Sequence, residues 1–369
     1  MMSRPKRITV LTILCASLFL AACSQNKVED PFGYSFIKER RIKRGSGKPY
    51  SEYKAFYLLT EDFEPRVQSP GDVEQIREVL RFAGELSATY NIPWTHFVDA
   101  NALAPAMISD DARLKEKCRE LIADLKLMTG KGDDCELHLH GMLNRELLDL
   151  LKAEHKLRVK PSGAEDVQGY RQRKSFFFHS FYAAGYREMV TSLTYGKSFL
   201  EQVIYDGGQP VLAFRPGGWD HGSSSQDTLL YYSALIESGL TANSGLVTGR
   251  FGTQNWRVGN YPGHNLAAVE LRDKSITEIS PTSGPGGYVN PVLPNDLLKL
   301  AGSVSDEMAV IMSVYHLGSL QPEQSEADDR IQNERHVLES HFKTVADLVS
   351  KKVLYPVTIR QLLAILSEA

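Results

Sequence analysis

Two histidines separated by one residue, His138 and His140, are the side chains in this sequence with the clearest potential for chemistry. Side chains alternate along a β-strand, so a His-x-His pair there places both imidazoles on one face, while Leu137 and Leu139 point the other way. Imidazole is a preferred ligand of zinc and similar divalent ions. The pair therefore indicates two metal ligands presented by one rigid element, and a third ligand must come from elsewhere in the chain.

The elements that must position these histidines follow an alternation of short apolar runs and helical periodicity. From Lys54 onward this alternation is typical of repeated β/α units around parallel strands. We expect about seven units over roughly 310 residues, which favours a single distorted (β/α) barrel over two domains. The expected strands are 55–60, 94–98, the histidine strand, 211–214, 267–271, 308–315 and 353–357. The expected helices are 72–90, one that Ser109 caps and that ends near 128, 186–205, 225–238, 329–350 and a last one that Thr358 caps.

Polar and charged residues follow several of the predicted strands. Asp62 and Glu64 follow the first strand, Arg215 follows a middle one and His316 follows a late one. In a barrel of this kind, the active site is built where the strands end. We therefore expect these residues and the two histidines to meet at one end of the barrel.

An acid, two histidines, an arginine and a histidine on successive strands resemble the polysaccharide deacetylase family (carbohydrate esterase family 4, the NodB homology domain). The resemblance covers about residues 54 to 366. Thr60-x-Asp62 resembles the first motif, the two histidines the second, Arg215-Pro216 the third and His316 the fifth. It implies that Asp62 is the general base, that Arg215 orients it, that His316 is the catalytic acid, and that the metal ligands are His138, His140 and Glu64.

Two departures place the chain in a divergent branch of that family. Phe63 separates Asp62 from Glu64, where the common pattern has adjacent aspartates, and one residue separates the histidines instead of three. Which of the two carboxylates binds the metal stays open at this point. The fourth motif is not recognisable, and its candidates are Asp273 and the stretch Asn255-Trp256.

The ligand set indicates a catalytic rather than a structural metal. Two imidazoles and one carboxylate leave open positions on a divalent ion, for which zinc is the first choice. The expected reaction is removal of N-acetyl or O-acetyl groups from a cell-envelope or secreted polysaccharide. We expect Gly217 and Gly218 to contact the substrate and stabilise its oxyanion through their backbone amides, and Trp219 to stack on a sugar ring.

The first residues predict an exported lipoprotein. A basic start is followed by a short apolar run from Ile8 to Ala22, too short for a membrane span. Leu20-Ala21-Ala22-Cys23 resembles a lipobox, which implies that residues 1–22 are removed and that Cys23 carries lipid. We expect residues 23–53 to be a tether and N-terminal extension, with a basic run at 38–48 favoured as solvated, and residues 54–369 to be the catalytic domain. Ser24 favours a periplasmic location on the outer membrane.

Loss of Cys15 with the signal peptide and lipidation of Cys23 leave two cysteines, Cys118 and Cys135, in an oxidising compartment. A disulfide between them is chemically permitted, and two buried free thiols are the alternative. Loss of Arg4, Lys6 and Arg7 with the signal peptide changes the formal net charge from −3 to −6. That balance does not suggest a nucleic-acid partner, and nothing in the sequence identifies a protein partner.

A second class of function stays open beside the enzyme. The altered first and second motifs also suit a catalytically inactive lipoprotein that keeps the fold to bind glycan during polysaccharide export or assembly. A serine esterase is excluded because the sequence contains no Gly-x-Ser-x-Gly elbow.

Overall fold

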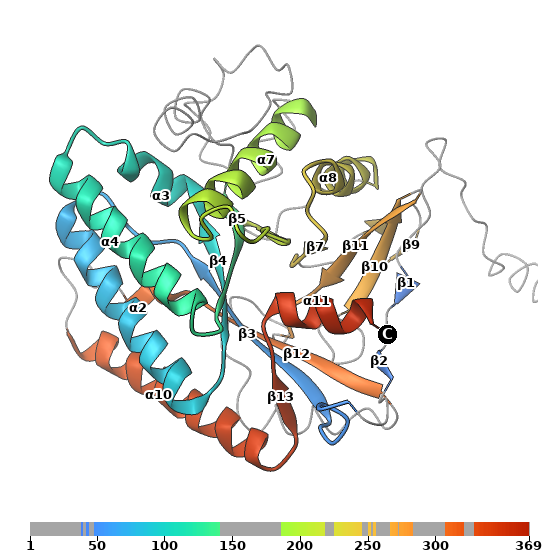
Figure 1. The fold of residues 1–369 in the computed structure, drawn as a ribbon. Coiled ribbons are helices and arrows are strands. Elements are labelled where there is room, and N and C mark those ends of the chain that lie inside the picture. Colours follow the sequence, from blue (N-terminus) through green and yellow to red (C-terminus); the bar gives the residue numbers. More distant parts are fainter. Residues whose placement is uncertain are drawn as a thin grey trace, which may run out of the picture.

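A curled sheet runs through the centre of the computed structural model (Figure 1). The structure describes residues 38–39, 42–43, 48–140, 186–217, 225–245, 250–251, 254–255, 266–271, 273–282, 307–320 and 328–368. Its parallel strands neighbour one another in the order β12 (Glu307–Tyr315), β3 (Ala55–Phe63), β4 (Trp94–Asp99), β5 (Asp134–Leu139), β6 (Ala213–Pro216), β7 (Ala242–Asn243) and β11 (Lys274–Ile279). A further strand, β13 (Leu354–Pro356), pairs in parallel with β3.

Antiparallel strands extend this sheet at both sides. Strand β10 (Leu266–Leu271) pairs with β11, and β1 (Lys38–Glu39) pairs with β10. On the other side β2 (Ile42–Lys43) pairs with β12. A separate two-stranded hairpin joins β8 (Arg250–Phe251) to β9 (Gln254–Asn255). Because the described sheet ends at β1 and β2, the α/β barrel predicted from the sequence is confirmed in a distorted, open form.

Two of these edge strands come from the basic run that we expected to be a solvated tether. Strands β1 and β2 lie within it, and the side chain of Ile42 is buried. Parts of that run therefore pair with the sheet. Residues 1–37, including Cys23, lie outside the described residues.

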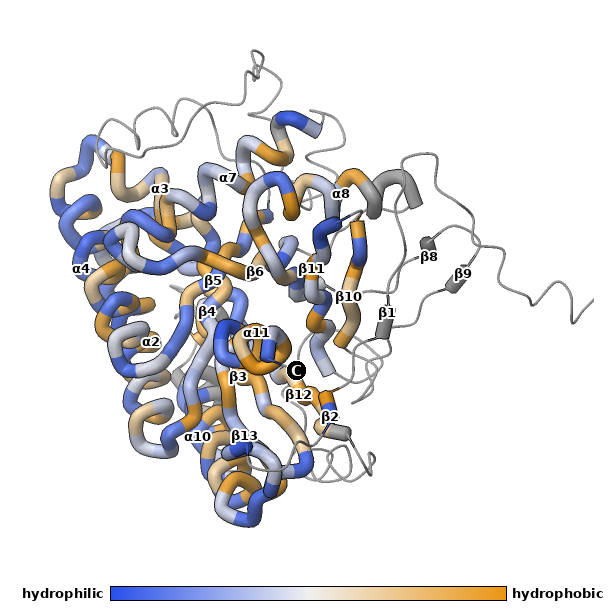
Figure 2. Tube along the Cα trace, turned by 45° about the vertical axis from the view of Figure 1, so that its right-hand side comes forward, coloured by the Kyte–Doolittle hydropathy of each residue, from blue (hydrophilic) through white to orange (hydrophobic). Residues whose placement is uncertain are grey.

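Amphipathic helices cover the outer face of the sheet. They are α2 (Pro70–Tyr90), α3 (Ala100–Met107), α4 (Ala112–Thr129), α7 (Tyr186–Val203), α8 (Ser225–Glu237) and α10 (Asp328–Ser350). Hydrophobic and hydrophilic residues alternate around the turns of α2 and α4 (Figure 2). The side chains that α2 buries recur at helical spacing, namely Val73, Ile76, Val79, Leu80, Ala83 and Leu86. Among the described helices, none is both long and apolar enough to cross a membrane.

The stretch between β4 and β5 differs from the prediction. We expected one helix capped by Ser109, but two helices occupy this stretch, and α4 is capped by Asp111, whose Oδ1 accepts hydrogen bonds from Arg113 N and Leu114 N. Ser109 instead accepts from the amide of Asp111. Asp99 caps α3 directly at the end of β4, so the strand passes into a helix without a loop.

The two faces of the sheet pack into different hydrophobic cores. One set of alternating residues, such as Tyr57 and Leu59 on β3, packs under the outer helices. The other set, such as Phe56 and Leu58, packs inside the curl against α11 (Ile359–Ser367). Figure 1 shows α11 on the opposite side of the sheet from α2, α4 and α10. Thr358 caps α11 in a complete capping box, as predicted.

Cys118 and Cys135 are both buried free thiols in the outer core. The second of the two alternatives is therefore the observed one, and the disulfide is not formed. Burial raises the pKa of Cys118 to about 11, and it raises that of Cys135 together with the charge of Asp134. Both thiols are consequently inert at neutral pH.

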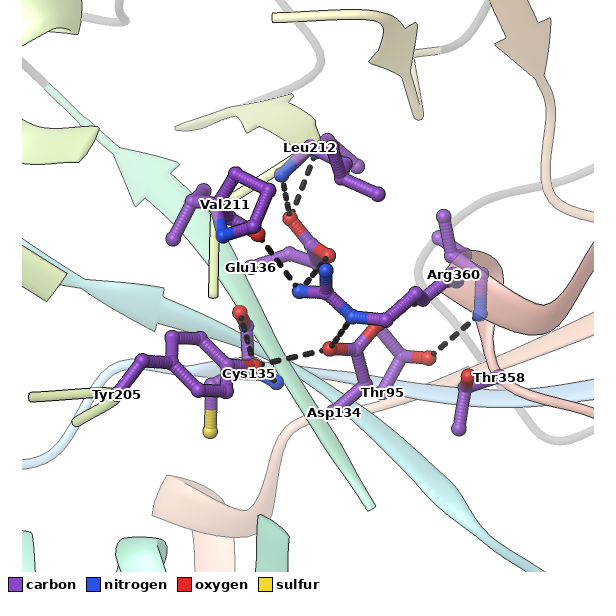
Figure 3. Close-up of polar contacts among 12 residues, drawn as sticks. Thr95, Asp134, Cys135, Glu136, Tyr205, Val211, Leu212, Thr358 and Arg360 are labelled. Atoms are coloured by element: carbon purple, nitrogen blue, oxygen red, sulfur yellow. Dashed lines mark hydrogen bonds and ion pairs between the residues drawn. The ribbon is translucent and has the colours of Figure 1, made fainter. Parts of the chain in front are cut away.

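Arg360 fastens α11 to the amino-terminal end of β5 (Figure 3). Its Nε donates to Asp134 Oδ1 at 3.0 Å, and its Nη2 donates to Glu136 Oε1 at 3.3 Å and to the carbonyl of Pro210 at 2.8 Å. The amides of Leu212 and Ala213 donate to the other oxygen of Glu136. These contacts hold α11 against the end of the sheet opposite to the carboxyl ends of its parallel strands.

Replacement of Arg360 by methionine tests how much these contacts contribute to stability. Because it leaves the buried carboxylates of Asp134 and Glu136 without their cation, we expect the free energy of unfolding to fall by roughly 3 kcal/mol. Urea denaturation followed by circular dichroism measures it. The matched control is Arg81→Met, which removes a more exposed pair with Glu74 and should cost less than about 1 kcal/mol. Equal losses in the two variants would show that the Arg360 contacts contribute no more than a surface pair.

Candidate active site

Among the described residues, the side chains expected to do chemistry lie on the inner face of the sheet. Inner residues alternate along each strand, so the positions of Phe56 and Leu58 on β3 continue to Thr60, Asp62 and then Glu64. The same alternation places His138 on β5, Arg215 on β6 and, just past β12, His316 on that face. The predicted site residues therefore come from separate strands to one end of the barrel.

Arg215 crosses the inner face to reach Asp62. Its guanidinium is fully buried and lies over the ring of Phe97, with Cζ 3.9 Å from the ring centroid. Nη1 donates to Asp62 Oδ1 at 2.6 Å, and Nη2 donates to Thr60 Oγ1 at 2.9 Å. Burial lowers the pKa of Arg215, while the charge of Asp62 opposes that shift. Asp62 thus receives a short, charge-assisted hydrogen bond that fixes its orientation.

A serine that the sequence did not reveal completes the surroundings of Arg215. Ser244, the residue after β7, accepts from Arg215 Nη2 at 2.9 Å and Nε at 3.2 Å. Strand β7 is the neighbour of β6 in the sheet, so Ser244 at the end of β7 lies beside Arg215 on β6. Of the candidates for the fourth motif, Asp273 is exposed in the turn between β10 and β11, Asn255 lies on β9, and Trp256 lies outside the described residues. Ser244 could not be found from the sequence, because the strand before it has only two residues and is too short to recognise.

The main chain of Arg215 also fixes one of the histidines. His138 Nδ1 lies 2.8 Å from the carbonyl oxygen of Arg215, and the two residues are in register on β5 and β6. A carbonyl oxygen only accepts hydrogen bonds, so Nδ1 carries the proton. In the neutral imidazole, Nε2 is therefore left with a lone pair.

That lone pair and His140 both face the carboxylate of Glu64. Glu64 Oε1 lies 2.9 Å from His138 Nε2 and 2.7 Å from His140 Nε2. Ligand atoms of these three residues lie within 4.8 Å of one another. Of the two carboxylates whose roles the sequence left open, Glu64 is the one directed at the histidines, whereas Asp62 is held by Arg215. The side chains of Glu64 and His140 are partly exposed, so the group opens to solvent.

The chemistry of this group suits a divalent ion. Neutral His138 and ionised Glu64 would place two acceptors 2.9 Å apart, a contact that needs a proton or a cation between them. Burial lowers the pKa of His138, but the charge of Asp62 and the hydrogen bond to Glu64 outweigh it and raise that pKa overall. Burial likewise raises the pKa of Glu64, yet the two histidines hold it well below its usual range. A cation bound by the three residues would satisfy the same atoms without a proton.

His316 faces Asp62 from the other side. Its Nε2 lies 3.5 Å from Asp62 Oδ2, and its side chain is 36% exposed, compared with 5% for Asp62. The aspartate thus lies between a buried arginine and a histidine that reaches solvent. This arrangement places two proton-exchanging groups beside the His138–His140–Glu64 group.

Asp99 is a further acidic residue at this end of the barrel. It ends β4 in register with His138, is buried, and accepts a hydrogen bond from the amide of Asn101 at 2.8 Å. Burial raises its pKa, against the effect of the charges of His138 and His140. Sequence reasoning overlooked it, because an aspartate before a helix is an ordinary cap.

Gly217 lies against His140. A Cβ atom built on Gly217 would lie 2.5 Å from Cγ and Nδ1 of the imidazole, a separation that real side chains do not tolerate. The ring of His140 therefore occupies the space that any other residue at position 217 would fill. Gly218, Trp219 and the segment 141–185 lie outside the described residues.

The fold and the site together define a class of protein. It is a distorted α/β barrel with a histidine–histidine–carboxylate group, a clamped aspartate and a partly exposed histidine at the carboxyl ends of its parallel strands.

Among known proteins, similarity is found at the level of solved structures. No family model and no curated protein matches this chain. Its structure is similar to that of a putative polysaccharide deacetylase from Mycobacterium smegmatis, with a TM-score of 0.48 and 11% identity over 88% of this chain and 93% of the other.

Two other solved structures show weaker or partial similarity. A 4-alpha-glucanotransferase from Thermococcus litoralis matches with a TM-score of 0.47 and 11% identity over 85% of this chain and 38% of that one. A mutant of a CE4-family pseudoenzyme with restored enzymatic activity matches with a TM-score of 0.30 and 10% identity over 78% and 62%. At these identities the likenesses concern the fold, and function must be inferred from the site.

Replacement of Gly217 by alanine tests the contact with His140. The added methyl group should displace the imidazole and weaken Zn²⁺ binding by about 10- to 100-fold, the usual effect of disturbing a ligand's support. Zn²⁺ titration against a chromophoric chelator measures this affinity. Gly71→Ala is the matched control, because the nearest atom to its Cβ lies 3.7 Å away, and it should bind Zn²⁺ as the parent chain does. Unchanged affinity in Gly217→Ala would contradict the proposed position of His140.

Proposed function

We propose that this protein is a metal-dependent hydrolase that removes acetyl groups from a cell-envelope or secreted polysaccharide. The observation that carries the proposal is the position of Asp62. It is bound by buried Arg215 on one side, lies 3.5 Å from His316 on the other, and shares an inner strand face with Glu64. A base, an acid and a ligand group are thus adjacent at one open end of the barrel.

The chain's own residues would divide the reaction as follows. Asp62, oriented by Arg215, would take a proton from the water that attacks the acetyl carbon. His316, on the solvent side of Asp62, would protonate the amine or alcohol that leaves. A divalent ion held by His138, His140 and Glu64 would polarise the acetyl carbonyl and make the water more acidic.

The substrate contacts belong to the same proposal. Gly217 lies beside His140, so we propose that its backbone amide is close to the place where the oxyanion would form. We extend the role to Gly218 and propose that Trp219 stacks on a sugar ring. N-acetyl hexosamine is the default substrate, and an O-acetylated sugar is the variant.

We also propose that the mature chain is a periplasmic lipoprotein, with residues 1–22 removed and Cys23 lipidated. The lipobox resemblance of Leu20-Ala21-Ala22-Cys23 supports this proposal. The Cys23→Ser chain should incorporate no labelled fatty acid, while the Cys118→Ser chain, altered at a buried thiol, should incorporate it as the parent chain does. Labelling of the Cys23→Ser chain, or no labelling of the parent chain, would contradict lipid attachment at Cys23.

Acetate release is the direct test of the activity. The purified protein, supplied with Zn²⁺, should release acetate from an N-acetylated or O-acetylated oligosaccharide, and a chelator should abolish the release until Zn²⁺ is restored. His138→Ala should lose the activity as well, because it removes a ligand. Acetate release that survives both chelation and His138→Ala would disprove the mechanism. A chain that binds no divalent ion and releases no acetate would instead favour the non-catalytic role of glycan binding.

Asp62→Asn separates the base from the metal ligands. The amide keeps the shape of the side chain but takes no proton, so kcat should fall by about 10²- to 10⁴-fold. Elemental analysis should still find the tightly bound ion, since His138, His140 and Glu64 are intact. Asp110→Asn, at an exposed position outside the barrel end, should leave both quantities unchanged. If Asp62→Asn lost the tightly bound ion, the aspartate would be a metal ligand and Glu64 the candidate base.

A further inference from the structure

We propose a second cation site, formed by Asp62, Glu64 and His316, that shares Glu64 with the first. Glu64 belongs to two groups of three residues in the described part of the chain, and in each group the ligand atoms lie within 4.8 Å of one another. The first contains His138 and His140. The second contains the pair that we assign as base and acid.

The spacing of Asp62 and His316 leaves room for a shared ion. Their nearest atoms, Oδ2 and Nε2, are 3.5 Å apart, beyond the usual range of about 2.7–3.2 Å for a hydrogen bond. Ligand atoms bound at about 2.1 Å to one tetrahedral ion lie about 3.4 Å from each other. Asp62 Oδ1 accepts from Arg215, so Oδ2 is the oxygen turned toward His316.

Glu64 is suited to serve both ions. A carboxylate has two oxygens with about four acceptor positions, and Oε1 is the one that faces both histidines. Pairs of metal ions that act together in hydrolases lie about 3.5–4 Å apart, a distance that one bridging carboxylate spans. The side chains of Glu64 and His316 are 32% and 36% exposed, so an ion from solvent has access.

The two ions should bind with very different affinities. Two doubly charged ions about 4 Å apart repel each other strongly even at high dielectric constant, and the charge of Asp62 is already partly balanced by Arg215. We expect the second ion to bind roughly 100-fold or more weakly than the first.

The second ion has a consequence for activity that rests on the proposed function. An ion on Asp62 and His316 occupies the atoms that would accept and donate protons. Activity should therefore rise as the first ion binds and fall again as the second binds. The site would act as an inhibitory sensor of excess metal.

Zn²⁺ binding to the full metal-stripped chain tests the inference without any substrate. Isothermal titration should find one tight and one weak ion per chain. His316→Gln should lose the weak ion and keep the tight one, Asp62→Asn should do the same, and His138→Ala should lose the tight one. His336→Gln, an exposed histidine on α10, is the matched control and should bind both ions. Circular dichroism of each variant verifies that it is folded.

The outcomes separate this inference from the proposed function. A single ion per chain up to millimolar Zn²⁺, or a weak ion that persists in both His316→Gln and Asp62→Asn, would overturn the second site. Two ions with no acetate release would leave the second site intact and contradict the deacetylase. Acetate release with one ion per chain and no inhibition by excess Zn²⁺ would support the deacetylase and contradict the second site.

Discussion

A buried guanidinium, that of Arg215, connects the parts of the site that the sheet alone would leave apart. It starts on β6, passes over Phe97 on β4 and ends at Asp62 on β3. An unpaired charge in that position would cost several kcal/mol, so the pairing with Asp62 stabilises the fold as well as orienting the carboxylate. Its backbone carbonyl meanwhile fixes the proton of His138 on Nδ1. One residue therefore orients Asp62, the proposed base, on one side and His138, a proposed metal ligand, on the other.

The division of the sheet into two faces explains why, among the described residues, the candidate active site lies at the carboxyl ends of the parallel strands. Along the inner face, apolar residues such as Phe56 and Met312 give way to Thr60, Asp62 and His316 toward the carboxyl ends of the strands. The outer face holds polar groups of its own, since buried His96 pairs with Glu61 there, but these are sealed under helices. Access to solvent, more than residue type, distinguishes the inner site from the outer pair.

The sequence predicted most of the elements and the residues that meet, because both depend on alternation. The period of α2 and the strand spacing of His138 and His140 are local patterns, and local patterns survive in the fold. What it did not predict depends on contacts between distant segments. Ser244 follows a strand of only two residues, Gly217 matters because His140 fills the space beside it, and β1 pairs with a strand more than 200 residues away. Asp111 caps α4 instead of Ser109, a boundary shift of the kind that single-sequence patterns do not resolve.

Strand β3 has its neighbours at opposite ends of the chain. It pairs with β4, which follows directly, but also with β12 and β13, and Thr60 donates a hydrogen bond to Ser313 across 253 positions. The carboxylates of Asp134 and Glu136 on β5 likewise pair with Arg360, more than 200 residues later in the sequence. Completion of the sheet around β3 therefore needs strands from late in the sequence. Such non-local pairing slows folding and leaves the early strands without these neighbours until the late strands are available.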